Sequence, residues 1–578
     1  MNVRRYVPIL SWLPAYDRSW LRFDVIAGLT LWGLVVPEGM AYAGIAGMPP
    51  QAGLYTLVVS LLVYALFGTS RHLSVGGTSA TAALLASSVA AALVASAFAT
   101  ASDPQAYPAY AAAFVLVTGL VFLVAGIARL GFITQFLSKP VMDGFVVGLA
   151  AFVAVGQLNK LLGVEKPEGN TIEKLVGIVR ELPEANPTTL AVGALALAAL
   201  FFLPRLSKRL PSGLVVLFGA IALSSVLDLA GRGVEVVGAL PQGLPTPALP
   251  VVPLEDYLGM VLPAIGVLLV AFSESLGVAH EFAEKHGYEV DSDQELNAHA
   301  VVNLGSALFG GLLAAGSMSS SAVKEGAGAR SQVANLVAWA ATIVTLMFLT
   351  PVFTSLPEAV LGALIIHAVW HILSSRKLLK LRQEAPVEVW FGVLALAGVV
   401  FIDVLQGMMI GLLVSLAFVV YRSSRPHLSS LGRVPGVAGV YADLTRHPES
   451  EPVPGVLIVR LDAPMYYANA LTARDRLKAM FREATPPPRA VVFDAEGQDE
   501  LDITSAQVLK GLVEELRRNG LAVAFASVHA PVLERARETG LLEAAGDGMI
   551  FATVDLAVRA LDGQASPPGE AHPGGVLP

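Results

Sequence analysis

The chain has 578 residues, of which 54% are hydrophobic and only 15% are charged, and its formal net charge is −8. Together with a mean hydropathy of +0.64, this composition predicts a membrane protein with several spans and a soluble part, and it excludes a purely soluble enzyme. The lack of cysteine excludes disulfides, thiolate metal sites and cysteine nucleophiles, and the negative charge argues against nucleic acid as a partner.

Residues 1–23 form the first predicted element, an N-terminal arm. The arm contains basic residues but no apolar core that ends in a small-residue cleavage site. We therefore interpret it as an amphipathic cytoplasmic arm and not as a signal peptide.

Apolar segments recur over residues 24–421, the predicted transmembrane domain. Two series of seven are expected, the first at 24–45, 51–67, 78–98, 110–130, 140–158, 188–204 and 212–230, and the second at 258–280, 296–313, 318–328, 333–355, 358–373, 387–403 and 405–421. Because seven is odd, two halves of similar fold must lie in opposite orientations in the lipid bilayer. The sequence therefore predicts a polytopic α-helical membrane protein with 14 transmembrane segments arranged as 7+7 inverted repeats.

The basic residues set the predicted orientation. If the N-terminus is cytoplasmic, the external loops hold only Lys160, Lys166, Lys174, Arg180 and Arg232, and the other basic residues of the membrane part fall inside. We therefore expect a multi-pass protein of the cell inner membrane with both termini in the cytoplasm.

The third segment of each half begins with small and hydroxyl-bearing residues. Gly76-Gly77-Thr78-Ser79-Ala80-Thr81 opens the third segment, and Gly316-Ser317-Met318-Ser319-Ser320-Ser321 opens the tenth, which is too short to span a bilayer. Such starts at matching positions indicate broken helices that meet at the midplane, where their free N–H groups favour a small anion. The alternative is that the small residues only allow close helix packing.

One carboxylate, Glu274, lies in the middle of an apolar segment. A carboxyl group inside a bilayer costs roughly 2.5–3.5 kcal/mol, so it usually faces a cavity and marks a pathway. We expect Glu274 to couple transport to protons, and the alternative is a hydrogen bond to a neighbouring Ser or Thr.

Histidines of the membrane part are not expected to form a site. His280 and His299 flank the polar acidic loop after the Glu274 segment and are interpreted as interfacial polar residues. His367 and His371 are four residues apart, but two ligands are too few for a metal site. We expect no metal and no cofactor.

The character of the chain changes after the last apolar segment. Residues 422–452 contain Pro and Gly and are expected to form a linker. Residues 453–563 alternate between strand patterns (VLIVRLD, AVVFDAEG, LAVAFASV) and helix patterns (LTARDRLKAMFREA, SAQVLKGLVEELRRN, APVLERARETGLL), which predicts a small cytoplasmic α/β domain. The Pro/Gly-rich tail 564–578 is expected to be disordered.

Four stretches of the chain together resemble the SulP/SLC26 family of anion transporters. They are Val36–Ala43 (VPEGMAYA), Ala65–Gly76 (ALFGTSRHLSVG), Glu274–Ala279 (ESLGVA) and the run from Gly316 to Gln332. The soluble domain resembles the STAS domain that this family carries. The resemblance implies a core (transport) domain, a gate domain, an elevator-like movement, homodimers and an anion site between the ends of the third and tenth segments.

Carried over onto this chain, the resemblance implies a set of substrate-binding residues, namely Glu38, Tyr42, Thr78, Ser79, Ser317, Met318, Ser319 and Ser320, with Glu274 as the coupling acid. Two positions depart from the family pattern. Glu38 stands where the first motif usually has Gln, and Ser320 stands where the tenth-segment motif often has Arg. The site thus lacks a fixed positive charge, and we expect Lys324, one turn later, to be a cytoplasmic-end cation of the short helix.

The predicted function is secondary active transport of a small inorganic or carboxylate anion, with sulfate, bicarbonate or a C4-dicarboxylate as substrate and a proton as the coupling ion. Three alternatives stay open. Sodium could be the coupling ion for bicarbonate uptake. It would then bind in a cage of oxygen atoms to which Glu274, Ser273, Ser317 and Ser319 could contribute. The protein could instead be an anion channel or exchanger, or a membrane anchor for a signalling STAS domain.

Overall fold

The computed structural model describes residues 6–96, 106–132, 138–165, 167, 169–206, 212–374, 383 and 386–562. The chain divides into two compact units, Met1–Leu416 and Ala417–Pro578, and each is described by itself. The tail 564–578, predicted to be disordered, lies outside the described residues.

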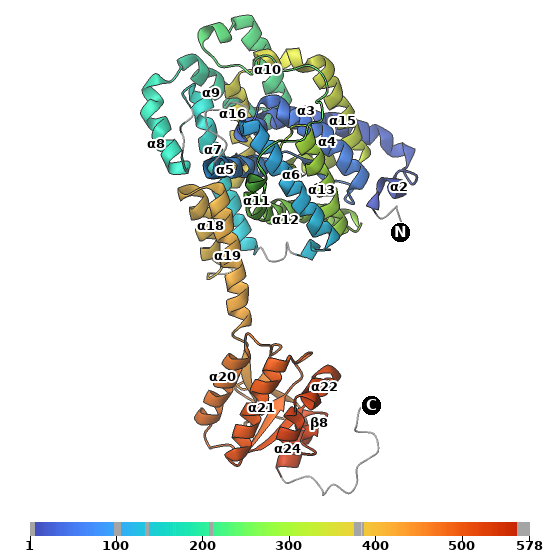
Figure 1. The fold of residues 1–578 in the computed structure, drawn as a ribbon, viewed down its shortest axis with the longest axis vertical. Coiled ribbons are helices and arrows are strands. Elements are labelled where there is room, and N and C mark those ends of the chain that lie inside the picture. Colours follow the sequence, from blue (N-terminus) through green and yellow to red (C-terminus); the bar gives the residue numbers. More distant parts are fainter. Residues whose placement is uncertain are drawn as a thin grey trace. The chain divides into compact units, whose positions relative to one another are not determined.

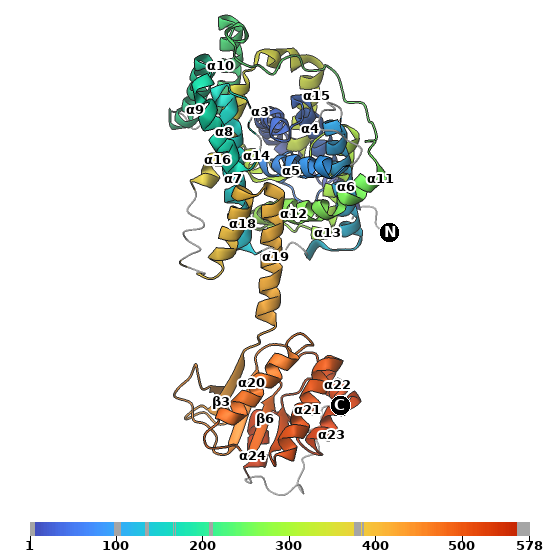
Figure 2. The same ribbon diagram turned by 60° about the vertical axis from the view of Figure 1, so that its left-hand side comes forward.

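Helices build the first unit (Figures 1 and 2). Its first half contains α2 (Ile9–Trp12), η1 (Arg18–Trp20), α3 (Leu21–Ile45), α4 (Pro50–Phe67), β1 (Ser74–Gly76), α5 (Ser79–Ala95), α6 (Ala106–Ile127), α7 (Lys139–Leu162), α8 (Thr171–Glu181), α9 (Pro187–Leu206) and α10 (Ser212–Leu227). Its second half contains α11 (Leu254–Gly259), α12 (Val261–His286), α13 (Ser292–Leu308), β2 (Ala315–Ser317), α14 (Met318–Gly326), α15 (Val333–Val344), η5 (Thr345–Leu349), η6 (Thr350–Ser355), α16 (Glu358–Leu373), α18 (Val389–Phe401) and α19 (Val404–Ser423).

Each of the fourteen predicted membrane segments contains one of these helices. Within the described residues, 8 helices are long and apolar enough to cross a membrane, and α5, α10, α16 and α18 are shorter apolar helices. The expected acidic loop after the Glu274 segment is shorter than predicted. Helix α12 continues to His286 and ends at Gly287, whose φ is +67°, and α13 already begins at Ser292 because Asp291 caps it.

The helices of the first unit sort into two groups by their contacts. Helices α3 to α6 pack with α12 to α15, and α7, α9 and α10 pack with α16 and α18. Helix α19 joins the second group, since a Cβ built at Gly398 of α18 would lie 2.7 Å from the Cα of Gly407 in α19. We call the first group the core and the second group the gate. The resemblance implies a core and a gate, and the contacts assign the helices to them.

Glycine allows the closest helix crossings within each group. In the core, a Cβ at Gly53 of α4 would lie 1.9 Å from the carbonyl oxygen of Gly39 in α3. In the gate, a Cβ at Gly144 of α7 would lie 2.0 Å from the carbonyl oxygen of Gly392 in α18. Small residues at such crossings let backbones approach closely, which is how helices associate where lipid replaces water.

Two short strands join the halves of the core. Strand β1 pairs antiparallel with β2, with Ser74 opposite Ser317 and Gly76 opposite Ala315. Side chains reinforce the pair, because the amide of Ser74 donates to Ser321 Oγ at 2.8 Å. The strands precede α5 and α14 directly, so the pairing brings the starts of these two helices together.

His299 does not lie at an interface as expected. It is fully buried in α13, where its ring stacks against Phe122 and meets Phe272 edge to face. The interfacial interpretation of His299 was therefore wrong, because the helix that carries it packs against α6 and α4 on the face that bears the imidazole. His280 is exposed.

The second unit is an α/β domain built on a six-stranded sheet of order β4-β3-β5-β6-β7-β8. Its elements are β3 (Leu428–Arg433), β4 (Tyr441–Asp443), β5 (Val456–Leu461), α20 (Ala470–Glu483), β6 (Ala490–Asp494), α21 (Ile503–Arg518), β7 (Ala522–Ala526), α22 (Ala530–Glu538), α23 (Leu541–Ala545), β8 (Ile550–Phe551) and α24 (Val554–Leu561). Strands β5 to β8 run parallel, and β3 and β4 are antiparallel additions. All three predicted strands and all three predicted helices are present.

Neighbouring residues of the central strands face opposite layers. Val459 of β5 packs with the layer of α20 to α23, and Ile458 packs with α24. Strands β3 and β4 lie within residues 422–452, the segment expected to be a linker. Their short apolar runs lack a clear alternation, so only the pairing of β3 with β5 and of β4 with β3 reveals them as strands.

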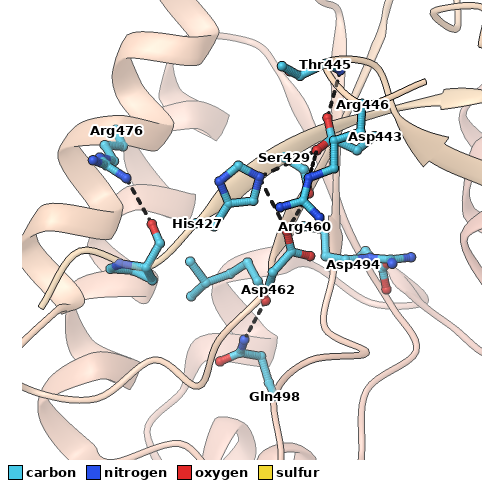
Figure 3. A network of polar contacts seen from close by, with 12 residues as sticks. His427, Ser429, Asp443, Thr445, Arg446, Arg460, Asp462, Arg476, Asp494 and Gln498 are labelled. Carbon is cyan, nitrogen blue, oxygen red and sulfur yellow. Dashed lines mark hydrogen bonds and ion pairs between the residues drawn. The ribbon is translucent and has the colours of Figure 1, made fainter. Parts of the chain in front are cut away.

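Polar contacts gather where β3, β4 and β5 meet (Figure 3). The Nε2 atom of His427 lies 3.5 Å from Asp443 Oδ2 and 3.8 Å from Asp462 Oδ2, and Ser429 donates to Asp462 at 3.0 Å. Partial burial raises the pKa of Asp443, but hydrogen bonds from Thr445 and His427 outweigh it and hold the pKa below its usual range. This network ties the first strand of the domain to its neighbours.

Candidate functional site

A cavity of about 870 Å³ lies between the core and the gate of the first unit. Core helices α3, α5, α12 and α14 form one wall, and gate helices α9, α10 and α16 form the other. The cavity is large enough for a small hydrated anion.

Most of the predicted site residues line this cavity, namely Glu38, Tyr42, Thr78, Ser79, Glu274, Ser317, Met318 and Ser319. Ser320 instead lines a smaller cavity, which Glu38 and Ser317 also line. There Ser320 lies beside Glu38, and its hydroxyl accepts from Ser317 Oγ at 3.0 Å. The structure therefore brings all nine residues into one neighbourhood, with Ser320 beside Glu38.

The N-terminal turns of α5 and α14 both lie at this cavity. Thr78 caps α5, since its side chain accepts from the amide of Thr81 at 3.1 Å and its amide donates to the Thr81 hydroxyl at 3.0 Å. Ser317 caps α14 by accepting from the amide of Ser320 at 3.3 Å. The other N–H groups of a first turn have no acceptor in their own helix, so both helix ends offer donors and a positive dipole end.

Glu274 is held next to β2 by the residue that follows it. Ser275 is fully buried, donates to the carbonyl of Ala271 at 2.6 Å and accepts from the amide of Gly316 at 2.7 Å. The Glu274 side chain itself faces the cavity. In the part of the chain that the structure describes, no Ser or Thr hydroxyl forms a hydrogen bond with it.

The gate wall is mostly apolar. It also carries a histidine that the sequence did not indicate as a residue of the anion site. Leu200, Leu214 and Leu364 face the cavity from α9, α10 and α16, and His367 of α16 also lines it. The His367 ring meets Phe201 edge to face at 4.9 Å. Over the described ranges, no group of three or more His, Asp and Glu side chains could hold a metal ion.

Lys324 does not have the environment expected of it. It lies in the last turn of α14, as predicted, but its side chain is fully buried. Its Nζ donates to the carbonyl of Leu73 at 3.1 Å and to Asn335 Oδ1 at 2.8 Å. The burial of Lys324 was not predicted, because the chain before β1 and α15 cover α14 and supply acceptors that no sequence pattern reveals.

Sequence comparisons place the whole chain among known transporters. A profile described as "Sulfate permease family" matches residues 21–395, and one described as "STAS domain" matches residues 447–557. A probable sulfate transporter of Mycobacterium tuberculosis is 33% identical over 545 residues, which cover 94% of this chain and 96% of the relative. Solute carrier family 26 member 10 of Mus musculus is 30% identical over 590 residues, covering 96% and 86% of the two chains.

Solved structures share the fold at lower identity. Murine Solute Carrier 26 family member A9 in its inward-facing state superimposes with a TM-score of 0.88 at 24% identity, over 98% of this chain and 95% of that one. The transmembrane domain of a cyanobacterium bicarbonate transporter gives a TM-score of 0.59 at 22% identity, over 70% of this chain and 98% of that one. These matches confirm the predicted fold class of a fourteen-segment membrane domain followed by a STAS domain.

Proposed function

The chain belongs to the sulfate permease family, and we propose that it is a secondary active transporter that moves a small anion together with protons. Its relatives are multi-pass membrane transporters and not enzymes. The observation that carries the proposal is the meeting of two helix starts and one carboxylate, Glu274, at a single cavity.

Charge balance at this cavity favours an anion with one negative charge. Each helix start contributes about half a positive charge, so α5 and α14 together supply roughly one unit. Hydroxyls of Thr78, Ser79, Ser317 and Ser319 add donors, while Glu38 adds negative charge unless it is protonated. We propose bicarbonate or a singly protonated C4-dicarboxylate as better substrates than sulfate, although relatives are named for both sulfate and bicarbonate.

The two walls of the cavity support an elevator-like movement. The hydroxyls and helix starts that would hold the anion belong to the core, and the gate offers mostly apolar side chains, with Ser212 and His367 as its polar ones. An anion bound in this way would move with the core along an apolar surface that has few polar groups to retain it. The neighbouring carboxylate Glu274 is also on the core, so proton and anion would move together.

The assembly and orientation are part of the same proposal. We propose a homodimer in the cell inner membrane with both termini in the cytoplasm, on the basis of the basic-residue distribution and the family resemblance. The proposed arm is 1–23 and the proposed membrane domain is 24–421. The expected linker 422–452 contains β3 and β4, which belong to the sheet of the second unit, so we propose that the STAS domain begins before residue 453.

Sodium coupling is a weaker candidate than proton coupling. The oxygen cage expected for sodium included Ser273, but the Ser273 hydroxyl donates to the carbonyl of Leu269 at 2.5 Å within α12. Ser273 is also not among the residues that line the cavity. A dehydrated Na⁺ would then have Glu274, Ser317 and Ser319 as its main ligands, which is few for an ion that loses its water shell.

Transport in liposomes tests the proposal against its alternatives. The purified protein is reconstituted, and uptake of labelled sulfate, bicarbonate and C4-dicarboxylate is measured under a proton gradient or a sodium gradient. We expect uphill accumulation under the proton gradient alone. Accumulation driven only by sodium would assign the alternative symport, and fast downhill flux without accumulation would assign a channel.

Glu274→Gln should keep the fold and abolish proton-driven uptake. The amide cannot release a proton, while the absence of a charge leaves insertion into the bilayer unchanged or easier. Glu281→Gln is the matched control, because Glu281 is exposed on the same helix and does not line the cavity. Normal proton-driven uptake by a well-expressed Glu274→Gln protein would end the coupling hypothesis.

A further inference from the structure

We propose that a second site, separate from the transport cavity, binds the phosphate headgroup of an anionic phospholipid. Two cavities of about 400 and 360 Å³ lie beside the N-terminal arm. Trp20, Arg71, Tyr288 and Arg330 line both of them, so the two cavities adjoin and together make up one region. We call it the arm cleft.

Two arginines in the arm cleft are positioned to receive an anion. The guanidinium of Arg71 lies 5.4 Å from the centre of the Tyr288 ring, and that of Arg330 lies 4.8 Å from the Phe23 ring. Among the described residues, neither guanidinium has a carboxylate oxygen within 4.0 Å. Stacking on a ring fixes the plane of a guanidinium and leaves its N–H edge free for a phosphate.

The acidic residues of the cleft do not cancel this charge. Glu325 is already paired, since its Oε1 lies 2.9 Å from Lys285 Nζ and 3.0 Å from His286 Nε2. Glu289 lines the larger cavity but is exposed. Among the described residues that line the cleft, the charges without an ion-pair partner are two arginines and the exposed Glu289. Asp24 lies behind the lining, where the amides of Arg330 and Ser331 donate to it at 2.7 and 3.2 Å, and Asp17 lies near Arg330.

The arm itself favours a lipid as the source of the phosphate. Leu10, Leu13 and Leu21 of the arm are each 47–49% exposed, which suits a segment that lies at the bilayer surface. Trp12 and Trp20 line the cleft, and tryptophan rings prefer the headgroup level. The indole N–H of Trp12 is buried and has no acceptor among the described residues, so a lipid oxygen would supply one.

The test uses the full chain in detergent micelles and its tryptophan fluorescence. Short-chain phosphatidylglycerol and phosphatidylcholine of equal acyl length are titrated, with sn-glycerol 3-phosphate as the free-phosphate arm. We expect a saturable signal with phosphatidylglycerol alone. In the variant with both Arg71→Gln and Arg330→Gln, affinity should fall about twenty-five-fold, since each arginine near an anionic lipid contributes about fivefold.

Arg205→Gln is the matched control. Arg205 is exposed and stacks over Phe202 at 5.1 Å, but it lies outside the arm cleft, so phosphatidylglycerol should bind as in the wild type. Anion uptake and the melting temperature of the double variant establish that it is folded. Equal phosphatidylglycerol binding by the double variant and the wild type would overturn the site. Equal binding of phosphatidylcholine, or of glycerol phosphate without a lipid, would overturn its assignment to an anionic lipid.

Discussion

Glu38 and Ser320 are the two residues at which the chain departs from the pattern that its resemblance to the family implies, and they line the same small cavity. A carboxylate replaces an amide at one position and a hydroxyl replaces a guanidinium at the other, so the neighbourhood loses one positive charge and gains one negative charge. Because both changes lower the local potential, the helix starts of α5 and α14 must supply most of the attraction for an anion. This charge balance is the basis of the substrate preference proposed above.

Ser320→Arg should shift preference toward dianions and weaken the pH dependence of binding. In the wild type, affinity should rise as pH falls, since protonation of Glu38 removes a repulsive charge. A guanidinium at position 320 would pair with the Glu38 carboxylate and make its protonation unnecessary. Binding of labelled sulfate and bicarbonate between pH 5 and 8 measures both effects.

Ser320→Ala is the control for Ser320→Arg, because it removes the hydroxyl without adding a positive charge. It should leave the preference for monovalent anions unchanged. If the wild type already binds sulfate tightly at pH 8, and Ser320→Arg alters neither selectivity nor the pH profile, the charge-balance argument is wrong.

At the scale of elements, the gate depends on helices that touch backbone to backbone. Helix α7 contains two glycines in different settings. A Cβ at Gly144 would meet the backbone of α18 at 2.0 Å, whereas nothing lies within 4 Å of a Cβ at Gly156. A Gly to Ala substitution at Gly144 therefore tests close packing, and the same substitution at Gly156 tests helix propensity alone.

Gly144→Ala should lower the thermal stability of the membrane unit, and Gly156→Ala should not. Forcing a methyl group into a packed crossing costs about 1–3 kcal/mol because the helices must separate. At an open position, Gly to Ala stabilises a helix by up to about 1 kcal/mol. Melting followed by size-exclusion chromatography in detergent measures both variants, and equal midpoints would contradict the packing argument.

At the scale of the whole molecule, the two units each have their own hydrophobic core. The membrane unit buries helix against helix, and the STAS unit buries both faces of its sheet under helices. Each unit therefore meets the physical conditions for folding without the other.

Removal of the residues after Arg425 should leave a folded membrane unit with reduced transport. We expect a monodisperse protein that binds the anion with wild-type affinity, because the cavity is lined by residues of the membrane unit alone. Uptake should fall less than tenfold. Anion binding to the truncated protein, measured by equilibrium dialysis, is the decisive quantity, and its complete loss would mean that the STAS unit helps to build the site.

The sequence by itself determined the features that depend on local composition. Apolar runs of bilayer length, the strand and helix periods of the STAS domain and the Gly/Ser starts of α5 and α14 are all readable because hydropathy and backbone preference act over a few residues. Glu274 was found in the same way, since a lone carboxylate stands out in an apolar run.

Only the tertiary structure decided where side chains point and what covers them. It placed Ser320 beside Glu38, brought His367 of the gate to the cavity and buried Lys324 and His299. It also paired β1 with β2, which lie about 240 residues apart in the chain. These outcomes depend on which helix faces meet. A contact between distant segments produces no periodic pattern and no change of composition in either segment, so it cannot be read from the sequence.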